Sequence, residues 1–249
     1  VFYCSHSQRS RRISYLLSQK GFTNVYNLNG GMSHLNQMTE KEFPCKQEFL
    51  KSNLKYQNIA SVNAIDLIKK NSELIILDVR PASMFYSRDS LVYYNTGRLK
   101  KTINIPYTEL KQRLNELTAY KNKPILVYAQ AGNNNAGRTA LELKNNDFSR
   151  VYVLIGGFDD MLVREDASSL IEGSPPYRIL HAAGALSLLK NNKNVTVYDT
   201  RSKMEFENKM PTQEYYRNLG HIKNAINIEA KEFDSFIYPK DKNVFFLIY

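Results

Sequence analysis

The chain opens with the run Val1-Phe2-Tyr3-Cys4-Ser5-His6-Ser7-Gln8-Arg9-Ser10, in which a thiol and a guanidinium stand five positions apart. The apolar residues before Cys4 predict a short strand, and residues 11–20 predict a helix after the loop. The backbone N–H groups of a strand-to-helix turn and the N-terminus of the helix both stabilise an anion. Nearby arginines favour the thiolate. The pattern indicates a reactive cysteine, although a cysteine at a strand end is also commonly a buried core residue.

Two further motifs occur twice in the chain. An apolar run ending in Asp-x-Arg appears at Asp78 and again at Asp199, 121 positions later (199 − 78). Each is followed by a segment that begins with glycine and ends in Asn-Ile. The paired stretches are Ile75-Ile76-Leu77-Asp78-Val79-Arg80 with Val195-Thr196-Val197-Tyr198-Asp199-Thr200-Arg201, and Gly97-Arg98-Leu99-Lys100-Lys101-Thr102-Ile103-Asn104-Ile105 with Gly220-His221-Ile222-Lys223-Asn224-Ala225-Ile226-Asn227-Ile228. A period this long indicates repeated domains rather than a solenoid.

The segment around Cys4 is also repeated. Tyr3-Cys4 corresponds to Tyr128-Ala129, and Gly30-Gly31 corresponds to Gly156-Gly157, with offsets of 125 and 126. Three units follow from these matches. Residues 1–45 form the C-terminal half of a first domain, residues 57–166 a complete domain, and residues 177–249 the N-terminal half of a further domain. Residues 1–45 are completed either by flanking sequence or by residues 177–249. In the second case one copy of the central strand is displaced, because both segments contain it, at residues 1–3 and at residues 244–249.

The order of strand, Cys-x4-Arg loop, helix and Gly-Gly turn resembles the active-site half of a rhodanese domain, and the Gly-x-x-Asn-Ile segments resemble another part of it. The resemblance implies an α/β fold of repeated domains, each a parallel five-stranded sheet flanked by helices. It implies a sulfurtransferase without cofactor or metal, in which Cys4 is the catalytic nucleophile. The loop implied to bind substrate consists of Ser5, His6, Ser7, Gln8 and Arg9.

The complete domain has Ala129 where the first unit has Cys4, and a methyl group cannot carry sulfur. We therefore expect this domain to be catalytically inactive. An offset of 125 places Asn134 at the position of Arg9; alternatively Arg138 is the loop arginine and the loop is four residues longer. The Gly/Asn-rich loop is either a solvated turn or a site for a small anion.

Three functions remain open. The favoured one is transfer of a sulfane sulfur from a donor such as thiosulfate to a thiol or cyanide through a Cys4 persulfide. Cysteine phosphatases, including one with a rhodanese-like fold, use a longer Cys-x5-Arg loop, so phosphatase activity is disfavoured. The third is an inactive rhodanese-like scaffold or regulatory binding protein. The partners expected are a small anionic sulfur donor, a thiol acceptor that is a small molecule or a protein, and in one arrangement a second copy of the chain in a homodimer.

Composition and charge disfavour two other classes of protein, those that span a membrane and those that bind nucleic acid. The 249 residues carry a net charge of +10 with scattered basic residues, and no apolar run reaches the roughly 20 residues that span a bilayer. Because no stripe of aromatics accompanies the basic residues, a nucleic-acid surface is disfavoured. Cys45 is either an incidental exposed cysteine or a resolving thiol, and Asp78, Asp199 and His221 are interpreted as structural. No signal peptide is visible, and because the chain begins at Val1, a cytoplasmic and a periplasmic location both remain open.

Overall fold

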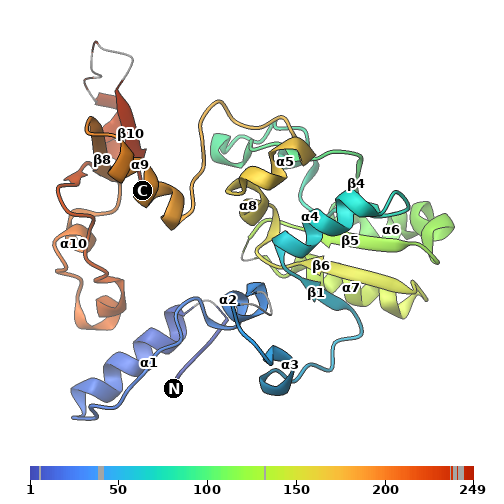
Figure 1. The fold of residues 1–249 in the computed structure, drawn as a ribbon, viewed down its shortest axis with the longest axis horizontal. Helices are drawn as coiled ribbons and strands as arrows, with labels where there is room; N and C mark the ends of the chain where they lie inside the picture. Colours follow the sequence, from blue (N-terminus) through green and yellow to red (C-terminus); the bar gives the residue numbers. More distant parts are fainter. Residues whose placement is uncertain (6, 39–41, 132, 236, 238–239, 241–243) are drawn as a thin grey trace. The chain divides into compact units, whose positions relative to one another are not determined.

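The computed structural model describes all residues except 6, 39–41, 132, 236, 238–239 and 241–243. Its described residues form two compact units, drawn with the rest of the chain in Figure 1. The first unit consists of residues 1–31 and 180–249, and the second of residues 32–179. No helix in the described part of the chain is long and apolar enough to cross a membrane.

The second unit is built on a parallel sheet of five strands in the order β1-β6-β5-β2-β4. All five residues of the central strand β5 are buried. A strand covered on both faces needs apolar side chains at every position, which explains the continuous run at residues 124–128. The strands are β1 (Gln57–Ile59), β2 (Ile75–Asp78), β4 (Thr102–Asn104), β5 (Pro124–Tyr128) and β6 (Arg150–Leu154). The predicted α/β fold with a five-stranded parallel sheet is confirmed.

Helices cover both faces of this sheet and enclose one apolar cluster on each. One cluster joins the sheet to Ala140 and Leu143 of α7, and the other joins it to Ile65 of α4 and Phe158 of α8. A small antiparallel pair, β3 (Arg98–Leu99) with β7 (Ile171–Glu172), lies beside it. The helical segments are α2 (Gly31–Gln37), α3 (Lys46–Phe49), α4 (Ser61–Lys70), α5 (Ala82–Phe85), η1 (Val92–Tyr94), η2 (Tyr107–Glu109), α6 (Leu110–Arg113), η3 (Leu114–Tyr120), α7 (Asn135–Asn145), α8 (Gly157–Leu162) and η4 (Glu165–Leu170).

The first unit repeats part of this architecture in the same register. Its parallel sheet has the order β10-β8-β9, and Asp199 lies opposite Asn227 as Asp78 lies opposite Asn104. Near the N-terminus, Phe2 forms a parallel bridge with Asn27, so the predicted first strand is reduced to one bridging residue. Phe2 therefore pairs within residues 1–31, and β10 pairs with β8 within residues 180–249. The elements are α1 (Gln8–Gln19), α9 (Ala182–Asn191), β8 (Val195–Asp199), α10 (Lys203–Phe206), η5 (Thr212–Arg217), β9 (Ile226–Asn227), η6 (Ala230–Ser235) and β10 (Phe245–Ile248).

The Asp-x-Arg motif forms the same structural lock in both sheets. Asp78 accepts a hydrogen bond from the Arg80 backbone at 2.8 Å and pairs with the Arg80 guanidinium at 2.7 Å, which in turn donates to the Gly97 carbonyl. Asp199 and Arg201 make the equivalent contacts, with the Gly220 carbonyl as acceptor. The structural interpretation of both aspartates is confirmed, because each carboxylate is used to close its turn and to neutralise the arginine.

Candidate active site

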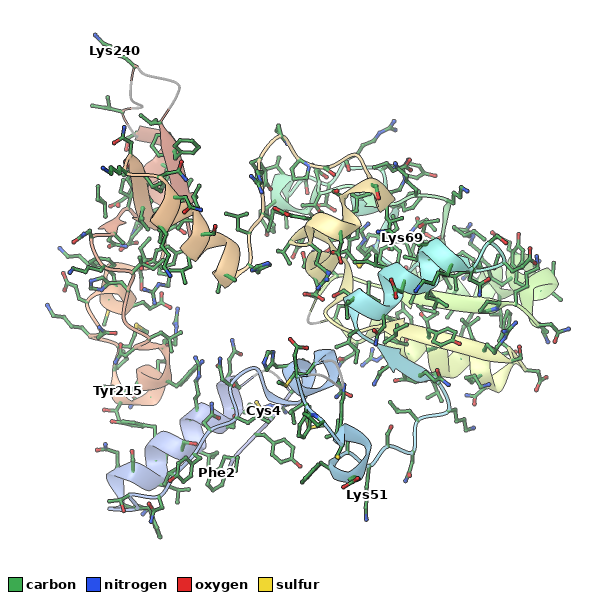
Figure 2. The ribbon with its side chains drawn as sticks, viewed as in Figure 1. Phe2, Cys4, Lys51, Lys69, Tyr215 and Lys240 are labelled. Carbon is green, nitrogen blue, oxygen red and sulfur yellow. The ribbon has the colours of Figure 1, made fainter. Side chains whose placement is uncertain are left out.

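Cys4 lies between the Phe2 bridge and the beginning of α1. Its side chain is partly buried, and Ser10 in the first turn of the helix directs its Oγ to the Cys4 sulfur at 3.6 Å. Figure 2 shows Cys4 beside the ribbon of α1. The helix begins at Gln8, three residues earlier than predicted, because the Ser7 carbonyl already accepts the Arg11 N–H. The helix N-terminus is thereby brought closer to the thiol.

Ser7 turns the loop into the helix. Its φ of 80° lies in the left-handed region, which is uncommon for a residue with a side chain. The side chain is almost fully buried, and its Oγ donates to the Leu28 carbonyl at 2.8 Å and accepts from Asn27 Nδ2 at 3.4 Å. These bonds tie the loop to the segment around Asn27 and Leu28 and hold the strained residue in place. Ser7 is therefore a positioning residue for the loop.

The Gly-Gly turn supports the loop from the other side. Gly31 has a φ of +58°, and a Cβ at this position would lie 2.0 Å from the Cys4 carbonyl oxygen and 2.8 Å from the Ser5 carbonyl. Only glycine permits both the φ and the close approach. The Gly30-Gly31 pair of the sequence motif thus has a physical role, which is to seat the backbone of the Cys4 loop.

Two arginines, Arg9 and Arg11, lie in the first turn of α1, which follows the loop. Arg9 and Ser5 are both exposed, and Arg9 Nη2 donates to Ser5 Oγ at 3.2 Å. Arg11 is also in the first turn of α1 and donates to Asn29 Oδ1 at 2.8 Å. These cations and the helix dipole act in the same direction on an anion at the loop. Of the other predicted loop residues, Gln8 is exposed and His6 lies outside the described residues.

Ser10 and Asn27 are contacts of this site that sequence reasoning did not single out. Ser10 is nearly buried and approaches the sulfur, and Asn27 holds Ser7. No signal pointed to Ser10, because the helix was predicted to begin at Arg11; Ser10 lies in the first turn only because α1 begins at Gln8. Nothing in the sequence marks Asn27, since its contact depends on the Phe2 bridge.

Two other singled-out residues lie elsewhere. His221 stacks on the Phe206 ring with centroids 4.0 Å apart, and its Nδ1 lies 3.0 Å from the Phe206 carbonyl. Cys45 is exposed at the beginning of α3, and both cysteines are thiols. Across the described positions, no three His, Cys, Asp or Glu side chains gather in a way that could hold a metal ion.

A model of the rhodanese-like domain matches residues 1–37 and 62–162, which is 138 of the 249 residues (37 + 101). The chain belongs to the rhodanese-like domain family. This is a sulfurtransferase-like family. The resemblance to rhodanese and the α/β fold predicted from the sequence are both confirmed.

Individual proteins that resemble this chain match it over less than half of its length. The uncharacterized protein YqhL of Bacillus subtilis (strain 168) is 37% identical over 65 residues, which is 26% of this chain and 49% of YqhL. The chain thus spans about half the length of this curated relative. Among solved structures, the BH2092 protein of Bacillus halodurans is 25% identical, with 42% of this chain and 69% of that chain covered and a TM-score of 0.33. A rhodanese-related protein of Thermoplasma volcanium is 25% identical, with 41% and 87% covered and a TM-score of 0.32.

The second unit has the same loop support without the thiol. Ala129 is buried, and a Cβ on Gly157 (φ +65°) would lie 2.5 Å from the Ala129 carbonyl oxygen, as Gly31 does at Cys4. Asp159 accepts the Ala131 N–H at 2.8 Å and a hydrogen bond from Gln130 Nε2. A carboxylate of the domain itself therefore occupies part of this loop.

The Ala129 loop is longer than the Cys4 loop. α1 begins at Gln8, four positions after Cys4, whereas α7 begins at Asn135, six positions after Ala129. Which residue takes the place of Arg9 stays a prediction, with Asn134 and Arg138 as the two candidates.

Proposed function

We propose that this protein is a sulfurtransferase in which Cys4 carries a sulfane sulfur from an anionic donor such as thiosulfate to a thiol or to cyanide. The observation that carries the proposal is a partly buried thiol at the N-terminus of a 12-residue helix whose first turn contains Arg9 and Arg11. Membership of the rhodanese-like family supports the same chemistry.

In the first half-reaction, the Cys4 thiolate attacks the outer sulfur of the donor. A bond forms between Sγ and this sulfur, and the sulfur–sulfur bond of thiosulfate breaks, so that sulfite leaves with the bonding electron pair. Arg9 orients the donor and offsets its negative charge at the mouth of the loop. The product on the protein is a Cys4 persulfide.

In the second half-reaction, the acceptor attacks the outer sulfur of the persulfide. With cyanide, a carbon–sulfur bond forms, the bond to Sγ breaks, and thiocyanate leaves while Cys4 returns to the thiolate. A thiol acceptor reacts in the same way once it is deprotonated, and carries the sulfur away as its own persulfide. Between the two steps, the loop from Ser5 to Arg9 and the helix dipole hold the persulfide anion. Ser10 Oγ, which lies 3.0 Å from the Ser7 carbonyl oxygen and 3.6 Å from Sγ, turns its one hydroxyl hydrogen to the sulfur when the anion forms.

The test compares the two cysteines of the full chain. After incubation with thiosulfate, we expect an adduct of about 32 Da, one sulfur atom, on Cys4. A Cys4→Ser variant should lose both this adduct and thiocyanate production from thiosulfate and cyanide. A Cys45→Ser variant, which removes the exposed thiol near α3, should keep both.

Two outcomes contradict the proposal. Equal thiocyanate production by the parent protein and the Cys4→Ser variant would remove Cys4 from the reaction. Hydrolysis of phenyl phosphate without sulfur transfer would favour a phosphatase. If neither activity depends on Cys4, a rhodanese-like binding protein without catalysis is the remaining function, and the second unit, which has Ala129 where the first has Cys4, would fit that description.

A further inference from the structure

The outer face of α1 combines cations with apolar side chains. Its outward-facing residues follow one another at intervals of three and four, so they form one stripe along the helix. Each member of this α1 stripe is exposed, and the members are Arg9, Arg12, Ile13, Leu16 and the C-cap Lys20. Figure 2 shows α1 extending away from the Cys4 loop. Because Arg9 donates to Ser5, the neighbour of Cys4, one end of the stripe lies beside this loop.

The other side of α1 is engaged within the first unit. Ser10 is nearly buried, and Tyr15 stacks on Tyr215 of η5 with ring centroids 4.5 Å apart. The acidic residue of η5, Glu214, pairs with Arg217 of the same element. The contacts that hold α1 in the unit therefore leave the α1 stripe exposed, and they do not use its charges.

The segment that carries Cys4 has positive charge and no acidic residue. Residues 1–39 contain no Asp or Glu, and their cations are Arg9, Arg11, Arg12 and Lys20. None of these four takes part in an ion pair among the described residues. By contrast, α7, the helix after the Ala129 loop, carries Glu142 between Arg138 and Lys144. A surface with several cations and no acid attracts an acidic partner.

The length and composition of the α1 stripe indicate that this partner is a protein. From Arg9 to Lys20 the stripe extends about 16 Å, eleven residues at about 1.5 Å each, which a small thiol cannot span. A helix that binds a membrane surface needs a broad apolar face, whereas this stripe has two apolar side chains among three cations. A surface for single-stranded nucleic acid needs exposed aromatic rings, and the stripe has none. An acidic protein surface that also presents apolar side chains matches both components of the stripe.

We propose that the α1 stripe docks the sulfur acceptor, and that this acceptor is a protein whose thiol stands beside an acidic surface containing apolar side chains. This inference rests on the proposed function, because it names the acceptor of the Cys4 persulfide. Carboxylates of the partner pair with the cations of the stripe, and its apolar side chains cover Ile13 and Leu16. The partner's thiolate forms a bond to the outer sulfur of the persulfide, the bond to Cys4 Sγ breaks, and Cys4 leaves as the thiolate.

The contact is expected to be transient. One face of a helix of this length buries little surface, which is typical of short-lived encounters between proteins. A carrier that must release its acceptor after each transfer is suited to such a contact.

Docking is measured without sulfur chemistry, in a Cys4→Ser background of the full chain. The probe is a fluorescein-labelled helical peptide, long enough to match the α1 stripe, with glutamate and leucine on one face and serine in place of the acceptor cysteine. In the control peptide every glutamate is replaced by lysine. Fluorescence anisotropy follows the titration of each peptide with protein, at low and at raised ionic strength.

α7 supplies the matched control, because it also exposes an arginine and a leucine one turn apart. Arg12→Glu with Leu16→Gln alters the α1 stripe, and Arg138→Glu with Leu141→Gln makes the same changes on α7, where Leu141 is 44% exposed, as Leu16 is on α1. We expect the acidic peptide to bind saturably, less tightly at raised ionic strength, and the lysine peptide not to bind. The α1 double variant should bind the acidic peptide about tenfold more weakly, because a charge is reversed and an apolar contact is lost. The α7 double variant should bind it unchanged.

The docking proposal is overturned if the acidic peptide does not bind saturably, if the lysine peptide binds as tightly, or if the two double variants bind equally. Binding to phosphatidylserine vesicles in place of the peptide would identify a membrane surface and would overturn it as well. The parent protein is assayed in parallel for thiocyanate production. Normal thiocyanate production without peptide binding overturns the docking proposal alone, whereas peptide binding without thiocyanate production overturns the proposed function and, with it, the role of the docked protein as sulfur acceptor.

Discussion

Replacing Gly31 by alanine should disable the Cys4 loop far more than the same change at Gly21. Both glycines have positive φ, +58° and +85°, so both variants carry the backbone penalty of about 1–2 kcal/mol for a left-handed alanine. A Cβ at Gly21 meets nothing within 4 Å, whereas at Gly31 it would lie 2.0 Å from the Cys4 carbonyl oxygen. To reach ordinary contact at 3.4 Å, that carbonyl must move by 1.4 Å (3.4 − 2.0).

This displacement sets the expected magnitudes. Overpacking adds about 1–3 kcal/mol, so Gly31→Ala should cost about 2–5 kcal/mol of unfolding free energy against about 1–2 for Gly21→Ala. A shift of about 1 Å in a reacting group can lower a rate about 100-fold, so thiocyanate production should fall by about that factor in Gly31→Ala alone. Urea unfolding followed by circular dichroism and a cyanolysis assay on the full chain measure the two effects. Equal losses in both variants would refute the close approach of Gly31 to the Cys4 loop.

Three further predictions concern the repeated motifs. Asp78→Asn should destabilise the second unit by about 3–5 kcal/mol in urea unfolding, because it leaves the buried charge of its arginine uncompensated; a loss under 1 kcal/mol would show that the pair is not needed. Burial disfavours the charged form of Asp199, but the hydrogen bonds from Arg201 outweigh burial and hold the pKa of Asp199 below its ordinary value. The ionised carboxylate therefore stabilises the folded protein. This stabilisation should be complete above about pH 4, and it should be lost as the pH falls through the lower pKa of the folded state. Thermal unfolding between pH 2 and 6 should show that Asp199→Asn flattens this slope, and an unchanged slope would contradict the assignment. In a protein that lacks the Cys4 thiol, Ala129→Cys should remain inactive in cyanolysis because Asp159 occupies the loop. Adding Asp159→Ser should increase the activity. Full activity of Ala129→Cys without the second substitution would show that the Asp159 carboxylate is no obstacle.

The repeats made most of the fold predictable. Asp78 and Asp199 each end an apolar run, and each run is followed by a segment that ends in Asn-Ile, so the sequence alone indicated that the two segments fold alike. In both sheets the aspartate lies opposite the asparagine, Asp78 opposite Asn104 and Asp199 opposite Asn227. The Phe2 strand was overestimated, because three apolar residues indicate a strand but do not determine how many of them pair.

The site was predictable only where residue type reveals its role. Cys4 and its arginines could be found because thiols and guanidinium groups carry chemistry. The roles of Ser7 and Asp159 depend instead on contacts with distant segments, the Leu28 carbonyl and the Ala131 amide. Local sequence carries no signal for such contacts.

Each loop rests on a glycine through backbone contacts alone, so the conformation of the loop does not depend on which side chain stands at its first position. Gly31 and Gly157 approach the residue at the head of the loop through its carbonyl group, which every amino acid possesses. A nucleophile can therefore be exchanged for an inert side chain without disturbing the surface on which it rests. One copy of the fold can therefore carry an inert side chain at this position while another carries a thiol, and a single substitution separates the two.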